Sequence, residues 1–217
     1  RGVKMSEYIE IKNLTKTLDR VNVLENINLS IEKNSIVGFV GKNGCGKTML
    51  FRAVSGLIKP TSGEIWIDGK LLGKDLSFPP SMGLIIENVG LWNYMTGFDN
   101  LKTLASIKKI ASDDDIRRSI RRVGLDPDDK RKFSKYSLGM KQRLVIAQAI
   151  MEKPELLILD EPTNALDEEG LESIRNVFIE EQQRGATILI ASHNSDDIGM
   201  LCSKCYQMSE GRIKKEL

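Results

Sequence analysis

The chain has 217 residues, of which 41% are hydrophobic, so it is long enough and apolar enough to bury a core. Its 32 basic and 30 acidic residues leave a net charge of only +2, which argues against a broad basic surface for nucleic acid. No apolar run is long enough to cross a bilayer. The three cysteines form an odd, sparse set, which favours a reducing cytosol over a disulfide framework.

The first part of the chain reads as antiparallel sheet. Residues 1–4, ahead of Met5, are interpreted as a remnant of expression and are left out of the fold. Apolar and polar residues alternate in 8–14, 27–31 and 64–70, which predicts half-buried strands. The last of these segments carries an Asp-Gly pair, which is typical of a hairpin turn.

Later apolar runs have a different pattern, because they are continuous rather than alternating. They are 35–40, 83–86, 156–160 and 187–192. Short runs rich in β-branched residues and leucine are typical of strands that are buried on both faces of a parallel sheet. Helical segments separate these runs, so the sequence predicts an α/β fold with an antiparallel sheet at its start.

The middle of the chain, about residues 90–150, is predicted to be a helical lobe inserted into the α/β core. Ser112 precedes three aspartates and then arginines, the order expected for a capped helix start. Residues 141–153 have a strongly helical composition and stop before Pro154. A serine and a glycine at 137 and 139 precede this segment. They could mark either an ordinary capped start or a phosphate-binding one.

A phosphate-binding loop is predicted at residues 41–48, which read GKNGCGKT and match GxxxxGK[ST]. The loop follows a buried strand and opens a helical segment, the context that separates this motif from a chance glycine-rich turn. Its backbone N–H groups would face phosphate oxygens, Lys47 would reach the β and γ phosphates, and Thr48 would ligate Mg²⁺. The predicted ATP contacts in this region are Gly41, Lys42, Asn43, Gly44, Cys45, Gly46, Lys47, Thr48 and Met49.

Cys45 lies inside this loop, beside a helix start and Lys47. We therefore expect a thiol reagent to react there and to block nucleotide binding, and bound ATP to protect the thiol. The other two cysteines, Cys202 and Cys205, form a lone CxxC and are interpreted as ordinary thiols rather than a zinc site.

Acidic and imidazole side chains follow two other predicted strands. Asp160 ends one strand and is placed to hold Mg²⁺, and Glu161 comes next as a candidate general base for an attacking water. The alternative is that these acids only end a strand. His193 follows the 187–192 run and is assigned a role near the γ-phosphate, although a lone histidine is often structural.

These motifs together resemble the nucleotide-binding subunit of an ABC transporter, over almost all of the chain after Met5. Their order and spacing are specific to that family. The matching segments are the phosphate loop at 41–48, a signature segment at 136–143, the Walker-B segment at 156–161, the D-loop at 164–167 and the switch histidine His193.

The resemblance implies a P-loop NTPase (RecA-like) core with an N-terminal antiparallel β subdomain and an inserted helical subdomain, forming a single domain over residues 5–217. It implies an ATPase that uses ATP and Mg²⁺. Two such subunits, identical or different, would sandwich each ATP between the phosphate loop of one and the signature of the other. A separate transmembrane permease would hold the subunit at the cytoplasmic face of the cell membrane, with no nucleic acid partner.

Three positions depart from the family pattern. The signature is usually LSGGQ, and Ser137 and Gly139 are retained while its first glycine and its glutamine are not. Glu87 falls at the Q-loop position, where a carboxylate could still contact Mg²⁺ or water near the reaction but cannot donate as an amide does. Leu18 stands where an aromatic residue usually stacks on adenine. The aligned signature residues are Tyr136, Ser137, Leu138, Gly139 and Met140.

The resemblance points to a transporter subunit, and within that class to an exporter, including exporters of antimicrobial peptides. One alternative is a non-transport ABC ATPase that acts on nucleic acid or the ribosome. Such proteins usually carry a coiled-coil insertion or two tandem ATPase domains, and this sequence has neither. A P-loop kinase or GTPase is the other alternative, but no guanine-reading NKxD-type element follows a strand.

Overall fold

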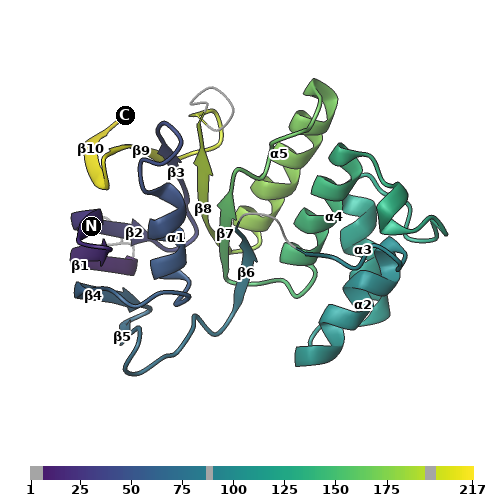
Figure 1. The fold of residues 1–217 in the computed structure, drawn as a ribbon. Helices are drawn as coiled ribbons and strands as arrows, with labels where there is room; N and C mark the ends of the chain where they lie inside the picture. The colour runs from purple at the N-terminus through teal and green to yellow at the C-terminus, as the bar shows by residue number, and fades with distance from the viewer. Residues whose placement is uncertain (1–6, 87–89, 194–198) are drawn as a thin grey trace, which may run out of the picture.

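A computed structural model of the chain describes residues 7–86, 90–193 and 199–217. Two β-sheets and a group of helices lie side by side (Figure 1). The antiparallel sheet and helix α1 lie at one side, the larger sheet is central, and helices α2 to α5 lie at the other side. The fold therefore has the three parts that the sequence predicts: an antiparallel sheet, an α/β core and a helical lobe.

The smaller sheet contains β1 (Glu7–Leu18), β2 (Val21–Glu32), β4 (Ser62–Ile67) and β5 (Lys70–Leu71), in the order β2-β1-β4-β5. Its strands are antiparallel, as the alternating pattern predicts. Between β4 and β5 the chain turns through Asp68 and Gly69, whose φ angles are 48° and 73°. Two consecutive left-handed residues match the right-handed twist of the strands, so the Asp-Gly pair makes this hairpin turn.

The larger sheet has six strands in the order β10-β9-β3-β8-β7-β6. Its central strands and β9 run parallel, while β10 pairs antiparallel with β9. The four continuous apolar runs form β3, β6, β7 and β8, so that prediction is confirmed, and β9 and β10 extend the sheet beyond it. The bounds are β3 Ile36–Val40, β6 Met82–Ile85, β7 Leu156–Asp160, β8 Thr187–Ser192, β9 Lys204–Ser209 and β10 Arg212–Glu216.

Both faces of β3, β7 and β8 are buried, which explains why these strands carry no polar alternation. Successive side chains of β7 point to opposite faces. Leu157 and Leu159 pack in the cluster that includes the helices of the lobe, and Leu156 and Ile158 pack in the cluster that includes α1 and the smaller sheet. The carboxyl ends of β7 and β8 therefore emerge between two packed layers, at one rim of the sheet.

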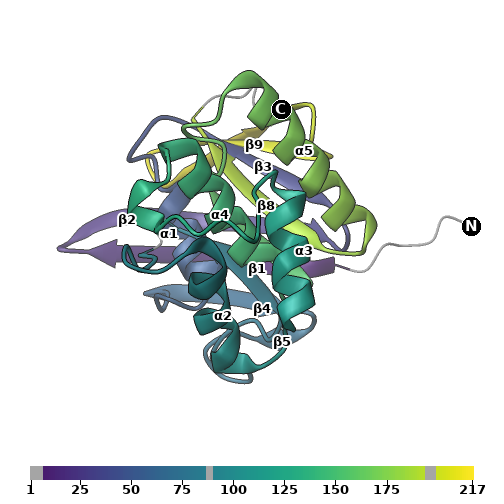
Figure 2. The same cartoon turned by 90° about the vertical axis from the view of Figure 1, so that its right-hand side faces the viewer.

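The helical lobe is built by α2, α3 and α4, which pack on one another in front of the sheet (Figure 2). Ser112 caps α3 through a capping box with Asp115, as its position predicts. Helix α4 begins three residues before the predicted segment, because Ser137 accepts a hydrogen bond from the N–H of Met140 and caps the helix there. The helix bounds are α1 Lys47–Val54, α2 Gly97–Lys108, α3 Asp113–Arg122, α4 Leu138–Ile150 and α5 Glu168–Gln183.

A buried carboxylate ties the lobe to the core. Glu181 of α5 is 0% exposed, and it pairs with Arg122 at the end of α3 and with Arg184. Arg122 also reaches Glu180 at 2.8 Å. Because a buried charge is costly when unpaired, this cluster fixes α3 against α5.

Candidate ATP-binding site

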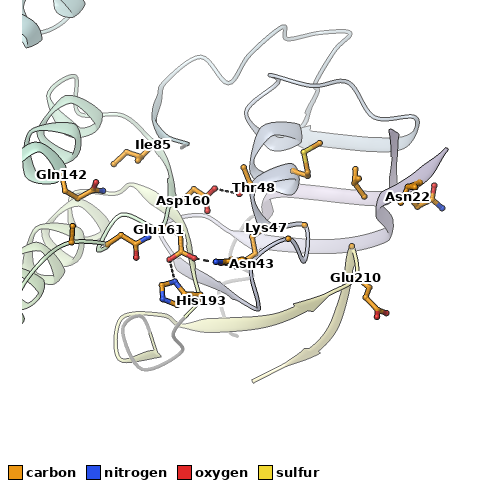
Figure 3. A pocket seen from close by; sticks show the side chains of 18 of the residues that line it. Asn22, Asn43, Lys47, Thr48, Ile85, Gln142, Asp160, Glu161, His193 and Glu210 are labelled. Atoms are coloured by element: carbon orange, nitrogen blue, oxygen red, sulfur yellow. Dashed lines mark hydrogen bonds and ion pairs between the residues drawn. The ribbon is translucent and has the colours of Figure 1, made fainter. Parts of the chain in front are cut away.

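A cavity of about 920 Å³ lies between the phosphate loop, the carboxyl ends of β7 and β8, and the start of α4 (Figure 3). It lies where ligands bind in open α/β sheets, at the carboxyl ends of the strands. The lining residues include Asn43, Gly44, Gly46, Lys47, Thr48, Met49, Asp160, Glu161 and His193. Segments that are far apart in the sequence thus meet at one site.

The phosphate loop is held in shape by its glycines and by Lys47. Gly46 has a φ of 110°, a conformation that only glycine adopts without strain. A Cβ at Gly41 would lie 2.4 Å from the carbonyl oxygen of Met208, so no side chain fits there. The ammonium of Lys47 donates to the carbonyl of Gly41 at 2.6 Å, and Lys47 is only 4% exposed. The loop therefore presents a buried positive charge beside a helix N-terminus.

Two hard oxygen donors meet at the first turn of α1. The hydroxyl of Thr48 donates to Oδ2 of Asp160 at 2.5 Å, and both residues line the cavity. A hydroxyl beside a carboxylate is the donor set that Mg²⁺ takes in nucleotide sites, where waters and phosphate oxygens complete its octahedron. The residues present therefore fit Mg²⁺.

Glu161 lies between a lysine and a histidine. Its Oε2 is 2.9 Å from Nδ1 of His193, and its Oε1 is 3.9 Å from Nζ of Lys47 (Figure 3). Oε1 is buried and has no hydrogen-bond partner among the residues that the structure describes. A buried carboxylate oxygen of this kind can accept a hydrogen bond, and then a proton, from a water molecule in the cavity.

The backbone of Glu161 is strained in a way that aims its side chain. Its φ of 48° places a non-glycine residue in the left-handed region, and its N–H donates to the carbonyl of Ala191 at 3.0 Å. Such conformations cost free energy and persist where surrounding contacts fix them. Asp160, in the preceding extended position, points toward Thr48 instead.

Ser137 and Gly139 of the signature lie at the start of α4 and line a different hollow, of about 410 Å³. Ser137 there caps its own helix, so the capped start is observed, and the expected phosphate contact stays a prediction. Gly139 packs against the D-loop, where a Cβ would be 3.1 Å from the carbonyl oxygen of Ala165. Neither residue lines the cavity at the phosphate loop of its own chain.

The structure does not bring every predicted ATP contact to the cavity. Leu18 does not line it, although it pairs with Val21 at the tip of the β1–β2 hairpin. Val21 and Val23 line the cavity instead, so the apolar wall comes from β2. Gly41 and Lys42 do not line it either and contribute carbonyls that hold Lys47. The predicted role of Glu87 falls outside the described residues.

Cys45 is also placed differently from its prediction. It is 7% exposed and packs in the apolar cluster of the smaller sheet and α1, rather than lining the cavity. The expected block by a thiol reagent and the protection by ATP stay predictions, and the burial of the thiol limits a reagent's access to it. Its side chain fills the space inside the loop beside Gly41, where a Cβ would lie 2.6 Å from Sγ.

The CxxC pair is consistent with ordinary thiols. Burial raises the pKa of the Cys202 thiol to about 12 and also raises that of Cys205. A thiol with a raised pKa is a poor thiolate ligand. Within residues 7–86, 90–193 and 199–217, no group of three or more histidine, cysteine or acidic side chains is placed to hold a metal ion.

Some lining residues were not among the predicted ATP contacts. Asn22, Glu210 and Gly211 come from hairpins, so only the paired strands bring them to the site. Gln142 and Leu138 come from the first turns of α4. Both belong to the signature segment at 136–143, which is the sequence signal that points to them.

A phosphate loop after the buried strand β3, with a carboxylate pair at the end of β7 beyond the intervening β8, defines a P-loop nucleotide triphosphatase. The ABC transporter family matches residues 24–164, and the chain belongs to that family. It is the ATP-binding subunit of an ABC transporter and an ATPase. No helix within the described part of the chain is long and apolar enough to cross a membrane.

Several curated relatives are similar over most of this chain. An uncharacterized ABC transporter ATP-binding protein of Bacillus subtilis, YybJ, is 55% identical over 95% of this chain and 94% of its own length. The bacitracin transport ATP-binding protein BcrA of Enterococcus faecalis is 38% identical, over 98% of this chain and 70% of its own. The lantibiotic transport ATP-binding protein SrtF of Streptococcus pyogenes is 35% identical, over 94% and 88%.

Solved structures share the fold. A structure of CbiO1 from Clostridium perfringens, part of an ABC transporter complex, has a TM-score of 0.83 at 27% identity and covers 97% of this chain and 88% of its own. The dimeric structure of the bacterial ABC transporter cassette MJ0796 has a TM-score of 0.87 at 24% identity, over 96% of this chain and 97% of that chain.

Proposed function

We propose that this subunit hydrolyses ATP in a head-to-tail dimer, in which Ser137 and Gly139 of one copy contact the ATP held by the phosphate loop of the other. The observation that carries the proposal is the separation of the two half-sites. Within one chain Ser137 and Gly139 line their own hollow, while Lys47 and Glu161 line the large cavity. A second copy would bring the missing half to each cavity.

The residues of the cavity have different roles in hydrolysis. Lys47 and the loop amides offset phosphate charge. Glu161 accepts a proton from water through Oε1, which has no hydrogen-bond partner among the described residues, and His193 holds Oε2 so that the carboxylate keeps its direction. Thr48 and Asp160 would hold Mg²⁺, which supplies positive charge against the β and γ phosphates when bound.

The subunit works with a separate membrane permease at the cytoplasmic face of the membrane. Support comes from its relatives, which are named as the ATP-binding proteins of bacitracin and lantibiotic transport. By the same likeness we propose an exporter whose cargo is a peptide antibiotic. The second subunit of the ATPase dimer is either another copy of this chain or a similar chain.

Growth inhibition tests the cargo. Cells with and without the gene are exposed to bacitracin and to a lantibiotic, and the deletion is complemented with wild type or with Glu161→Gln. The proposal predicts that deletion sensitises cells to one of these peptides and that only wild type restores resistance. Unchanged sensitivity to both peptides would contradict this cargo class.

A further inference from the structure

A side chain from the helical lobe reaches the backbone that follows the candidate base. Nε2 of Gln142, on α4, donates to the carbonyl oxygen of Pro162 at 2.8 Å. Pro162 directly follows Glu161 in the sequence. Gln142 also lines the large cavity, and Figure 3 shows it on the helix that faces Glu161. A residue of the lobe thus contacts the turn that carries the base of the core.

This turn depends on outside contacts for its shape. Glu161 has the left-handed φ of 48°, and proline at 162 has no N–H with which to anchor the next peptide. On one side, the N–H of Glu161 is held by Ala191 of β8. Inside the turn, the N–H of Asn164 reaches the Glu161 carbonyl at 3.3 Å. The Pro162 carbonyl is held from the other side by Gln142.

Arg143, the next residue on α4, fixes the start of the helix that carries Gln142. The guanidinium of Arg143 donates to the carbonyl of Val123 at 3.1 Å and lies 3.9 Å from Asp167. Two glycines make room for it, since a Cβ at Gly124 or at Gly170 would lie 2.6 or 2.7 Å from its terminal nitrogens. The start of α4 is therefore packed against the D-loop and α5 on either side of the Pro162 contact.

We propose that Gln142 is a positioning residue for Glu161. Its amide fixes the Pro162 carbonyl, which keeps Glu161 left-handed, with Oε1 toward Lys47 and Oε2 on His193. The inference rests on the role of Glu161 proposed above. Because α4 also carries the signature, the same contact makes the position of the base depend on the position of the signature helix.

The test removes the donor while keeping the size of the side chain. Gln142→Glu and Gln142→Met are the loss variants, and Gln142→Lys restores a donor of similar reach. Gln182, on α5, is the matched control. Its Nε2 also donates to a backbone carbonyl, that of Asn34, at 2.7 Å, and neither residue lines the cavity. The measurements are kcat for ATP hydrolysis, the Kd for ATP by equilibrium titration, and the melting temperature.

The proposal predicts that Gln142→Glu and Gln142→Met lower kcat by about 3- to 10-fold, the effect of one hydrogen bond, with the Kd for ATP unchanged. Gln142→Lys should keep most of the turnover, and Gln182→Met should match wild type in kcat. If Gln142→Met and Gln182→Met lower kcat and the melting temperature by equal amounts, the positioning role is wrong and the role of Gln142 is only structural.

Glu161→Gln in the same series separates the two proposals. If Glu161→Gln abolishes turnover while the Gln142 variants turn over like wild type, the positioning role is wrong and Glu161 remains the base. If Glu161→Gln keeps normal turnover, the assignment of the base fails, and the role of Gln142 fails with it.

Discussion

Nδ1 of His193 lies 2.9 Å from Oε2 of Glu161, across the carboxyl ends of β7 and β8. This contact fixes one oxygen of the carboxylate and leaves the other, Oε1, buried without a hydrogen-bond partner among the described residues. The pair therefore has the arrangement of a base and the group that orients it.

Replacing His193 should slow hydrolysis without weakening ATP binding. His193→Ala removes the contact that orients Glu161, and we expect kcat to fall by about 10- to 100-fold. His193→Gln, which can still donate to Oε2, should lose less. Single-turnover phosphate release with saturating ATP measures the step directly. An alanine variant with the kcat of wild type would show that the histidine is only structural.

Mixing two inactive variants tests the composite site. Lys47→Ala removes the charge that faces phosphate, and Ser137→Ala removes the signature hydroxyl, so each variant alone should be inactive. A mixed dimer has one intact site, with Lys47 from one chain and Ser137 from the other. Random mixing should restore roughly a quarter of wild-type turnover if the sites act independently. Turnover in Ser137→Ala alone at the wild-type level would contradict a role of the signature in trans.

ATP affinity should depend on the apolar residues of β2 rather than on the end of β1. Val21 lines the cavity and Leu18 does not. We expect Val21→Ser to weaken ATP affinity by roughly 3-fold, the effect of a partly exposed apolar contact, and Leu18→Ser to leave it unchanged. Fluorescence titration with a labelled ATP analogue measures both. A larger loss of ATP affinity in Leu18→Ser than in Val21→Ser would support the predicted adenine contact of Leu18 and contradict the role of β2.

Asp115 of α3, which contacts Lys153 and Ser112, should make stability depend on pH in the acid range. Hydrogen bonds from Lys153, and then from Ser112, hold the pKa of Asp115 well below its usual range. Because the pKa is lower in the folded state, the ionised carboxylate stabilises the fold fully at pH values above the unfolded pKa of about 4. This stabilisation is lost as the pH falls from there toward the folded pKa. Asp115→Asn should therefore cost about 1 kcal/mol at pH 7 and progressively less below about pH 4.

Urea unfolding at pH 7 and at pH 3.5 measures this difference, with Asp114→Asn as the control. Asp114 is an exposed neighbour in the same first turn of α3. A constant difference between wild type and Asp115→Asn across the acid range would show that the ion pair with Lys153 contributes nothing.

The sequence predicts the core of this fold because its signals are local. Continuous apolar runs identify β3 and β7, and the motif at 41–48 places Lys47 and Thr48 on a loop and a helix start. The Ser112 cap is equally local. Such features depend on residues within a turn or a strand of each other, so propensity and spacing are enough.

The rest of the site could not be predicted, because it depends on pairing between distant segments. Whether Leu18 or Val21 lines the cavity depends on which strand of the β1–β2 hairpin faces it, and the sequence pattern does not specify that strand. The burial of Cys45 depends on packing against the smaller sheet. The Gln142–Pro162 contact joins residues 20 apart in the sequence, on two different elements.

The central claim is that Glu161 is the base of an ATP-bound dimer, and Glu161→Gln tests it most directly. The amide keeps the shape of the side chain and loses the ability to take a proton. Size-exclusion chromatography with light scattering, together with phosphate release, measures the variant with ATP. We expect a stable dimer that retains ATP and releases no phosphate. A monomer with ATP bound, or phosphate release at the wild-type rate, would contradict it.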